Sequence, residues 1–222
     1  FEKEWYGARG MPHVEYVGHP LVGSVKPNFG REEFCRRHEL NTAQPIVTFL
    51  PGSRHKELVR ILPPMLDAGA EISKTRPDVQ FVLVIAPNRD PTEAQQIISQ
   101  RQAGSPPEML RVIHHETPEA LAASDAAAVA SGTATLEAAL LGTPMVIVYK
   151  ESSINWHVLG GLIQVDNYGL VNLVAERKVV KELMQNDLTG TELARELLAL
   201  LDPERKQTIR NELREVSAKL GQ

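Results

Sequence analysis

The chain of 222 residues is 42% apolar and 23% charged, a composition typical of a globular protein and unlike that of a disordered or collagen-like chain. Its 24 basic and 28 acidic residues leave a net charge of −4, which excludes a protein that binds nucleic acid through its overall charge. A single cysteine, Cys35, excludes an internal disulfide and a cysteine-based zinc cluster, so we expect the reducing environment of the cytoplasm.

The first residues carry no targeting signal. The segment that begins Phe1-Glu2-Lys3 lacks both an initiator methionine and the apolar core of a signal peptide. The sequence also contains no run of about 18 apolar residues of the kind that spans a bilayer. We therefore expect a chain that belongs to a longer protein and that has no membrane span.

Five short runs rich in apolar residues alternate with helical patterns and predict five strands. Two of them, residues 81–85 and 145–149, are apolar throughout, which is typical of parallel strands that helices cover on both faces. The sequence therefore predicts an α/β fold with a doubly wound parallel sheet. The five strands are expected at residues 46–50, 81–85, 111–113, 126–130 and 145–149.

Two predicted helices follow the first and fourth strands. The first has an apolar stripe at helical spacing over residues 58–72, but Pro63 and Pro64 interrupt it and should kink it or start a second helix. The second is expected over residues 133–141 and should end at Gly142, because glycine commonly ends helices. Both helices begin where strand-following loops end.

Two amphipathic helices are predicted at the end of the chain, over residues 191–201 and 203–220. The apolar stripe of the second must pack against another surface. The sequence leaves two places open for these helices. They can cover a further domain outside this chain, or they can exchange between two copies in a homodimer.

The loop after the first strand is a candidate anion-binding site. It reads Leu-Pro-Gly-Ser-Arg over residues 50–54, with Ser53 as a candidate N-cap and Arg54 in the first helical turn. Free amides at a helix N-terminus together with a guanidinium favour phosphate. Glu57 lies one turn further and has no definite role. The alternative is a capped helix whose charged side chains are simply solvated.

The loop after the fourth strand is the second candidate. Its small residues, Ser131 and Gly132, allow a ligand to approach the backbone. A pyrophosphate can bind to the amides and hydroxyls of Gly132, Thr133 and Thr135, while Glu137 accepts hydrogen bonds from two ribose hydroxyls. The alternative is an N-cap followed by an acid that complements the helix dipole. Two such loops after strands of one sheet favour a nucleotide site.

Other sites are not indicated. His114 and His115 are adjacent and make a poor metal pair without a third ligand, so we expect at most a contact with a nucleotide base. The sequence lacks the glycine-rich dinucleotide and P-loop signatures, the zinc-protease motif and the serine-hydrolase motif. We therefore expect neither a metal nor a cofactor.

Several motifs occur in the order of a known family. They are Tyr-Val-Gly-His-Pro-Leu at 16–21, Leu-Pro-Gly-Ser-Arg at 50–54 with Glu57, Ser-Gly-Thr-Ala-Thr-Leu-Glu-Ala-Ala-Leu at 131–140, Gly-Thr-Pro-Met-Val at 142–146, Tyr-Lys at 149–150, Asn-Leu-Val-Ala at 172–175 and Glu-Leu-Met-Gln at 182–185. On these motifs the chain resembles the bacterial lipid-A-disaccharide synthases. These are inverting, metal-independent glycosyltransferases of the two-domain glycosyltransferase-B fold.

The resemblance implies that the chain is the C-terminal, UDP-sugar-binding half of such an enzyme. Residues 1–22 would be a remnant of the N-terminal domain with the interdomain linker, residues 23–188 a Rossmann-like domain and residues 189–222 a helical tail. The family transfers 2,3-diacylglucosamine from UDP to 2,3-diacylglucosamine 1-phosphate and so forms the lipid A disaccharide. Two rivals stay open: another UDP-N-acetylglucosamine transferase or epimerase of the same fold, and a non-catalytic nucleotide-binding fragment.

The resemblance also implies roles for individual residues. Ser53 and Arg54 would contact the pyrophosphate and Glu137 the ribose. The general base of the family lies in the N-terminal domain, so we name no catalytic residue and expect this chain alone not to catalyse transfer. The implied UDP-sugar-binding residues are Ser53, Arg54, Glu57, Ser131, Gly132, Thr133, Thr135, Glu137, Asn172, Glu182 and Gln185.

The acylated substrates of the family imply a peripheral contact with the cytoplasmic face of the inner membrane. Between Lys150 and Arg177 the chain has no Lys or Arg, so hydrophobic side chains would have to supply that contact. The alternative is that these side chains pack in the core. The residues concerned are Ile154, Trp156, Leu159, Leu162 and Ile163.

Overall fold

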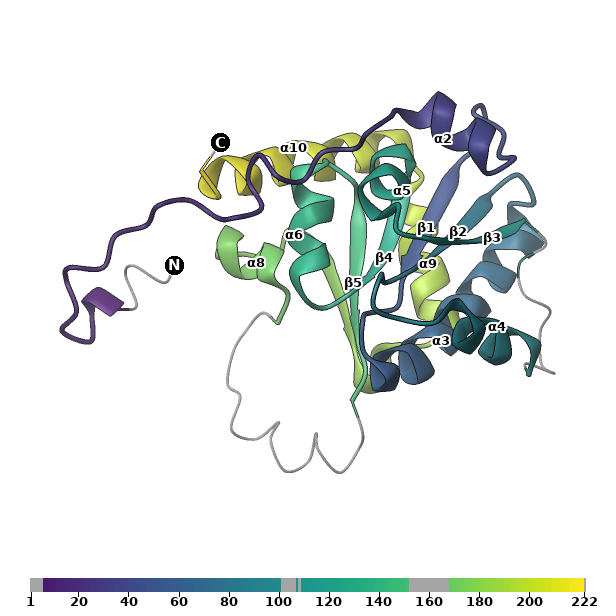
Figure 1. Cartoon of the computed structure of the whole chain (residues 1–222), viewed down its shortest axis with the longest axis horizontal. Coiled ribbons are helices and arrows are strands. Elements are labelled where there is room, and N and C mark those ends of the chain that lie inside the picture. Colours follow the sequence, from purple (N-terminus) through teal and green to yellow (C-terminus); the bar gives the residue numbers. More distant parts are fainter. Residues whose placement is uncertain (1–5, 101–106, 108, 152–167, 222) are drawn as a thin grey trace.

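The computed structural model describes residues 6–100, 107, 109–151 and 168–221. Within these ranges a six-stranded parallel sheet lies between two layers of helices (Figure 1), which confirms the predicted fold class. The strands are β1 (Ile46–Leu50), β2 (Gln80–Ile85), β3 (Leu110–His114), β4 (Ala126–Ala130), β5 (Met145–Tyr149) and β6 (Lys181–Met184). The helices are α2 (Arg31–Arg37), α3 (His55–Thr75), α4 (Pro91–Ser99), α5 (Thr117–Ala123), α6 (Thr133–Leu140), α8 (Leu170–Ala175), α9 (Gly190–Leu200) and α10 (Pro203–Lys219), with a 3-10 turn, η2 (Gln185–Asp187).

The strand order is β3-β2-β1-β4-β5-β6, and every neighbouring pair is parallel. The chain moves outward from β1 to β3, returns to the centre, and moves outward again from β4 to β6. Because right-handed crossovers are the rule, these two directions place the connecting helices on opposite faces. The loops after β1 and β4 therefore diverge, and a crevice opens between them at the carboxyl edge of the sheet.

The five predicted strands are confirmed, including the alanine-rich run that forms β4. All five residues of β4 are buried, and the strand lies at the centre of the sheet between β1 and β5. The small side chains let α6 pack on one face and α9 on the other. Burial on both faces outweighs the weak strand propensity of alanine here.

The sixth strand, β6, was not predicted from the sequence. It has four residues, and only Leu183 among them is buried. A short edge strand with polar side chains carries little of the apolar signal that identifies buried strands. It forms because β5 offers a free edge, along which Val146 pairs with Lys181.

Helix α3 runs through Pro63 and Pro64 as one helix, so the expected start of a second helix does not occur. The two prolines remove the amides that would bond to the carbonyls of Val59 and Arg60. Val59 is 43% exposed, so water can satisfy a carbonyl on this side of the helix. The opposite side packs along α9, which holds the helix together across the prolines.

The two C-terminal helices are confirmed as α9 and α10, and both pack on this domain. Helix α9 lies against α3, β4 and β5, whereas α10 lies along α6 and α8 (Figure 1). The apolar stripe of α10 is buried at Ile209, Leu213 and Val216. The end of α10 also meets the N-terminal part of the chain, where the Tyr16 hydroxyl donates to the Leu220 carbonyl at 2.8 Å.

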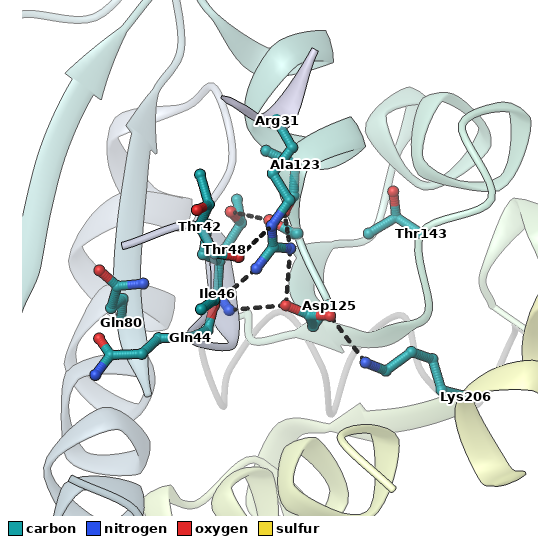
Figure 2. Close-up of polar contacts among 12 residues, drawn as sticks. Arg31, Thr42, Gln44, Ile46, Thr48, Gln80, Ala123, Asp125, Thr143 and Lys206 are labelled. Atoms are coloured by element: carbon teal, nitrogen blue, oxygen red, sulfur yellow. Dashed lines mark hydrogen bonds and ion pairs between the residues drawn. The ribbon is translucent and has the colours of Figure 1, made fainter. Parts of the chain in front are cut away.

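A charged cluster closes the amino edge of the sheet (Figure 2). The Asp125 carboxylate accepts hydrogen bonds from Arg31 at 2.9 Å, from Lys206 at 2.8 Å and from the Ile46 amide at 3.0 Å. Burial would by itself raise the pKa of Asp125, but the bonds from Lys206, Ile46 and Arg31 together outweigh it and lower the pKa below its usual value. The cluster thereby ties α2 and α10 to the starts of β1 and β4.

Candidate functional site

A pocket of about 300 Å³ opens at the carboxyl edge of the sheet, where the strand order reverses between β1 and β4. This is the position at which doubly wound α/β proteins bind ligands. The loop after β1 forms one wall and the loop after β4 forms the other. The predicted site residues that line it are Ser53, Arg54, Glu57, Ser131, Gly132, Thr133 and Glu137.

The loop after β1 is closed by its own carboxylate. Glu57 accepts hydrogen bonds from the amides of Ser53 at 3.0 Å and Arg54 at 3.2 Å, and from the Arg54 guanidinium at 2.7 Å. The N-cap of α3 is Arg54, so the expectation that Ser53 caps the helix is wrong by one residue. The cap function comes instead from the acid one turn along, as in a capping box. Gly52 has a φ of +106°, and a Cβ there would collide with the Glu57 side chain.

The loop after β4 is open. Gly132 is the N-cap of α6 with φ +155° and ψ −165°, a conformation that glycine alone adopts readily, and it provides no side-chain cap. In the described part of the chain, the amides of Gly132, Thr133 and Ala134 have no hydrogen-bond acceptor. Because free amides at a helix N-terminus attract anions, this loop presents to the pocket a helix end that can bind an anion.

Glu137 lies one turn into α6 and lines the same pocket. Burial raises the pKa of its carboxyl group, and no charged partner among the described residues offsets this effect. Partial burial of a carboxylate without a hydrogen-bond partner costs free energy. The arrangement can bind a molecule that carries an anionic group for the amides and hydroxyl donors for Glu137.

Thr135 does not line the pocket. It is fully buried, and its hydroxyl donates to the Gly132 carbonyl at 2.7 Å. This bond holds the backbone of the second loop on the side away from the pocket. From the sequence we expected Thr135 to contact a pyrophosphate together with Gly132 and Thr133. The turn of the helix places the two threonine side chains on different faces.

Asn172 and Glu182 lie apart from the pocket and bond to the backbone. The Asn172 amide donates to the Val180 carbonyl at 2.9 Å and to Glu182 at 2.7 Å, and its oxygen accepts from the amides of Val179 and Val180. Glu182 also accepts from the Gly169 amide at 3.0 Å. These bonds fasten the start of α8 to β6 and leave the Asn172 side chain fully used.

Gln185 begins η2 at the end of β6. Its oxygen accepts a bond from the Glu151 amide at 3.3 Å, while its amide nitrogen is buried without a partner among the described residues. The pocket lining does not include this residue. Whether Asn172, Glu182 or Gln185 touches a ligand therefore stays a prediction that rests on the family resemblance.

Further lining comes from loops that the sequence analysis did not single out. Ala86 and Pro87 follow β2, and Thr117 begins α5. Their position directly after strands of a parallel sheet was the available signal, although their residue types carry no chemical signature. His114 lies nearby with its Nε2 atom 3.2 Å from the Ala86 carbonyl, and its ring contacts that of His115 edge-on.

Two remaining expectations concern metals and membranes. Among the described residues, no group of three His, Cys, Asp or Glu side chains gathers as a set of metal ligands. No helix in the same part of the chain is long and apolar enough to cross a bilayer. The hydrophobic residues proposed for membrane contact, Ile154, Trp156, Leu159, Leu162 and Ile163, lie outside the described residues.

A crevice at the switch point of a β3-β2-β1-β4-β5-β6 sheet, with an open helix end and an acid that has no partner among the described residues, is typical of the class of Rossmann-like domains. The model of the lipid-A-disaccharide synthetase family matches residues 1–222, and the chain belongs to that family. The lipid-A-disaccharide synthase of Solibacter usitatus is 43% identical over the whole chain, which covers 56% of that relative.

Solved structures show the same fold at low sequence identity. A glycosyltransferase from Rickettsia africae superimposes with a TM-score of 0.59 at 11% identity, over 85% of this chain and 46% of that one. Anabaena HepE in complex with UDP-glucose gives a TM-score of 0.57 at 16% identity, over 91% and 51% of the two chains. These likenesses confirm the predicted Rossmann-like fold. The chain spans about half the length of the relatives that it matches.

Proposed function

We propose that the chain is the nucleotide-sugar-binding half of a lipid-A-disaccharide synthase. The complete enzyme would transfer 2,3-diacylglucosamine from UDP to 2,3-diacylglucosamine 1-phosphate and release UDP. Family membership over the whole chain supports the activity of the complete enzyme. The pocket at the switch point supports the assignment of this chain as its nucleotide-sugar-binding half. The single observation that carries the proposal is the pairing of the open α6 N-terminus with Glu137 in one pocket.

The pocket suits a nucleoside diphosphate better than a simple phosphate. The diphosphate would bind to the free amides of Gly132 and Thr133, where the helix dipole favours negative charge. Glu137 would accept hydrogen bonds from the two ribose hydroxyls, because only a carboxylate offers acceptors to both. Ser131 would add a small side chain beside the phosphates.

Transfer requires that UDP depart with its negative charge stabilised. Arg54, which bonds to Glu57 in the free chain, would turn toward that charge, and the amides of the α6 N-terminus already line the pocket before the reaction begins. Such preorganised donors lower the barrier because they need little rearrangement in the transition state. In this proposal the described residues bind and stabilise the leaving group, and they do not activate the acceptor hydroxyl.

The general base would come from the part of the enzyme that the matched relatives have beyond this chain. We propose residues 1–22 as a remnant of the N-terminal domain and linker, 23–188 as the donor-binding domain and 189–222 as its helical tail. The acylated substrates would bring the enzyme to the cytoplasmic face of the inner membrane as a peripheral protein. A homodimer is a further proposal, which light scattering would test.

Calorimetric titration of the chain with UDP tests the proposed function, with CMP as the nucleotide control. We expect UDP to bind with one site per chain and the isolated chain to show no transfer activity. Activity should appear when the N-terminal half is supplied in trans. Absence of UDP binding would contradict the proposal, and full turnover by the chain alone would contradict the proposed division of roles.

A further inference from the structure

We propose that Glu57 is a built-in anion that occupies the first loop, so that the phosphates of a nucleotide bind at the second loop and the first loop contributes only the Arg54 side chain. This inference rests on the proposed function. It assigns Glu57 a positioning role for the diphosphate, in place of the direct contact that the family resemblance implies.

The geometry of Glu57 is that of a bound oxyanion. One carboxylate oxygen takes both amides at the start of α3, those of Ser53 and Arg54, and the other takes the Arg54 guanidinium. Amides of a helix N-terminus and a guanidinium are the donors that proteins offer to phosphate. Only 16% of the Glu57 side chain is exposed, so the carboxylate is held within the loop and away from bulk water.

Gly52 leaves the space that the Glu57 carboxylate occupies. Any Cβ at position 52 would collide with the Glu57 side chain, and the φ of +106° belongs to the region that side chains other than glycine rarely adopt. The loop is therefore shaped around its own acid. A phosphate that entered the same place would have to displace Glu57 and would meet its negative charge.

The second loop has the opposite character. Residues 133–136, the first turn of α6, contain no acid, and the Gly132 and Thr133 amides have no acceptor among the described residues. The nearest acid on this helix, Glu137, lies one turn along and faces the pocket without bonding to these amides. The two loops therefore differ at the turn into the helix: the Ser53 and Arg54 amides are bonded to Glu57, whereas the Gly132 and Thr133 amides are available to a diphosphate.

Arg54 is the mobile contribution of the first loop. Its side chain is 80% exposed and reaches Glu57 across one helical turn. Exposed pairs of this kind are weak, so the guanidinium can leave Glu57 for a phosphate in the pocket. Glu57 would meanwhile keep the two amides and hold the backbone of Arg54 in place, which positions the side chain for this exchange.

Amide NMR of the chain distinguishes the two loops directly. The chain is titrated with inorganic phosphate and, separately, with UDP, while the amide shifts of Ser53, Arg54, Gly132 and Thr133 are followed. We expect both ligands to move Gly132 and Thr133 and to leave the Ser53 amide nearly unchanged. Shifts of the Ser53 and Arg54 amides as large as those of Gly132 would overturn the inference.

A Glu57→Ala variant should convert the first loop into a second phosphate site. We expect inorganic phosphate to move the Ser53 and Arg54 amides of this variant and to raise its Tm more than that of the unmodified chain. Glu71→Ala is the matched control, because Glu71 lies on the same helix and pairs with Lys74 at the surface. An E57A variant whose Ser53 amide ignores phosphate would overturn the inference.

Glu57→Gln covers the case in which the alanine variant does not fold. Its carboxamide oxygen can still accept from the two amides, but its NH₂ group cannot accept from Arg54. We expect UDP to bind about threefold to fivefold tighter, because Arg54 no longer leaves an ionic partner. A tenfold loss of UDP affinity would instead show that Glu57 contacts the nucleotide. If UDP binds to no variant, the proposed function fails, while the phosphate titration still reports on the first loop.

Discussion

Each edge of the sheet has a partly buried acid, and the two acids differ in their hydrogen-bond partners. Asp125 immediately precedes β4 at the amino edge, and its carboxylate accepts hydrogen bonds from three donors, which belong to α2, α10 and β1 (Figure 2). Glu137 follows the same strand at the carboxyl edge, and no partner among the described residues compensates its burial. Hydrogen bonds lower the pKa of Asp125 in spite of its burial, whereas burial raises the pKa of Glu137.

Asp125 therefore stabilises the fold, whereas Glu137 is the acid for which we propose a ligand. A buried charge with several hydrogen bonds contributes to stability only while all its partners stay in place. A buried charge without partners costs stability and persists where binding needs it. Substitutions at the two positions should therefore affect different measurements.

The largest expected effect is on folding, from Asp125→Asn. The variant leaves Arg31 and Lys206 without their shared acid, and we expect a loss of about 3 kcal/mol in the free energy of unfolding. Urea denaturation measures the loss. Asp78→Asn is the control, since Asp78 forms a half-exposed pair with Arg76 and should cost less than about 1 kcal/mol. Equal losses would remove the distinction between the clustered and the surface acid.

Glu137→Gln should lower the affinity for UDP and leave the stability of the fold unchanged or slightly higher. We expect UDP affinity to fall about 30-fold, because the carboxamide offers one acceptor where the carboxylate offers two to the ribose hydroxyls. Stability should stay the same or rise slightly, since the variant removes an uncompensated buried charge. Calorimetry and urea denaturation of the same preparation measure both quantities. A destabilised variant with unchanged UDP affinity would show that Glu137 serves the fold.

The smallest expected effect is the pH dependence of UDP binding. Because burial raises the pKa of Glu137, the free chain takes up a proton there as pH falls, and the protonated acid loses its capacity to accept two hydroxyls. Affinity should be constant above the raised pKa and fall by at most about tenfold per pH unit below it. E137Q should lack this slope, and a slope that persists in E137Q would assign it to another group.

Much of the framework could be predicted because it depends on local patterns. Continuous apolar runs identify β2 and β5 as buried strands, and the glycine after α6 identifies the end of that helix. The loops at 50–54 and 131–137 were also identifiable, because small residues and charged side chains directly follow predicted strands. Strand β6 escaped detection because an edge strand of four residues needs no apolar pattern.

The contents of the site depended on contacts that no local pattern reports. Both loops read as anion sites in the sequence, yet the geometry fills the first with Glu57 and leaves the second open. Asn172 and Glu182 occur in family motifs like the pocket residues, but the structure bonds them to each other and to the backbone just before β6 and α8. Local periodicity determines which residues form strands and helices. Which polar groups are already satisfied depends on where distant segments meet, and only the tertiary structure decides that.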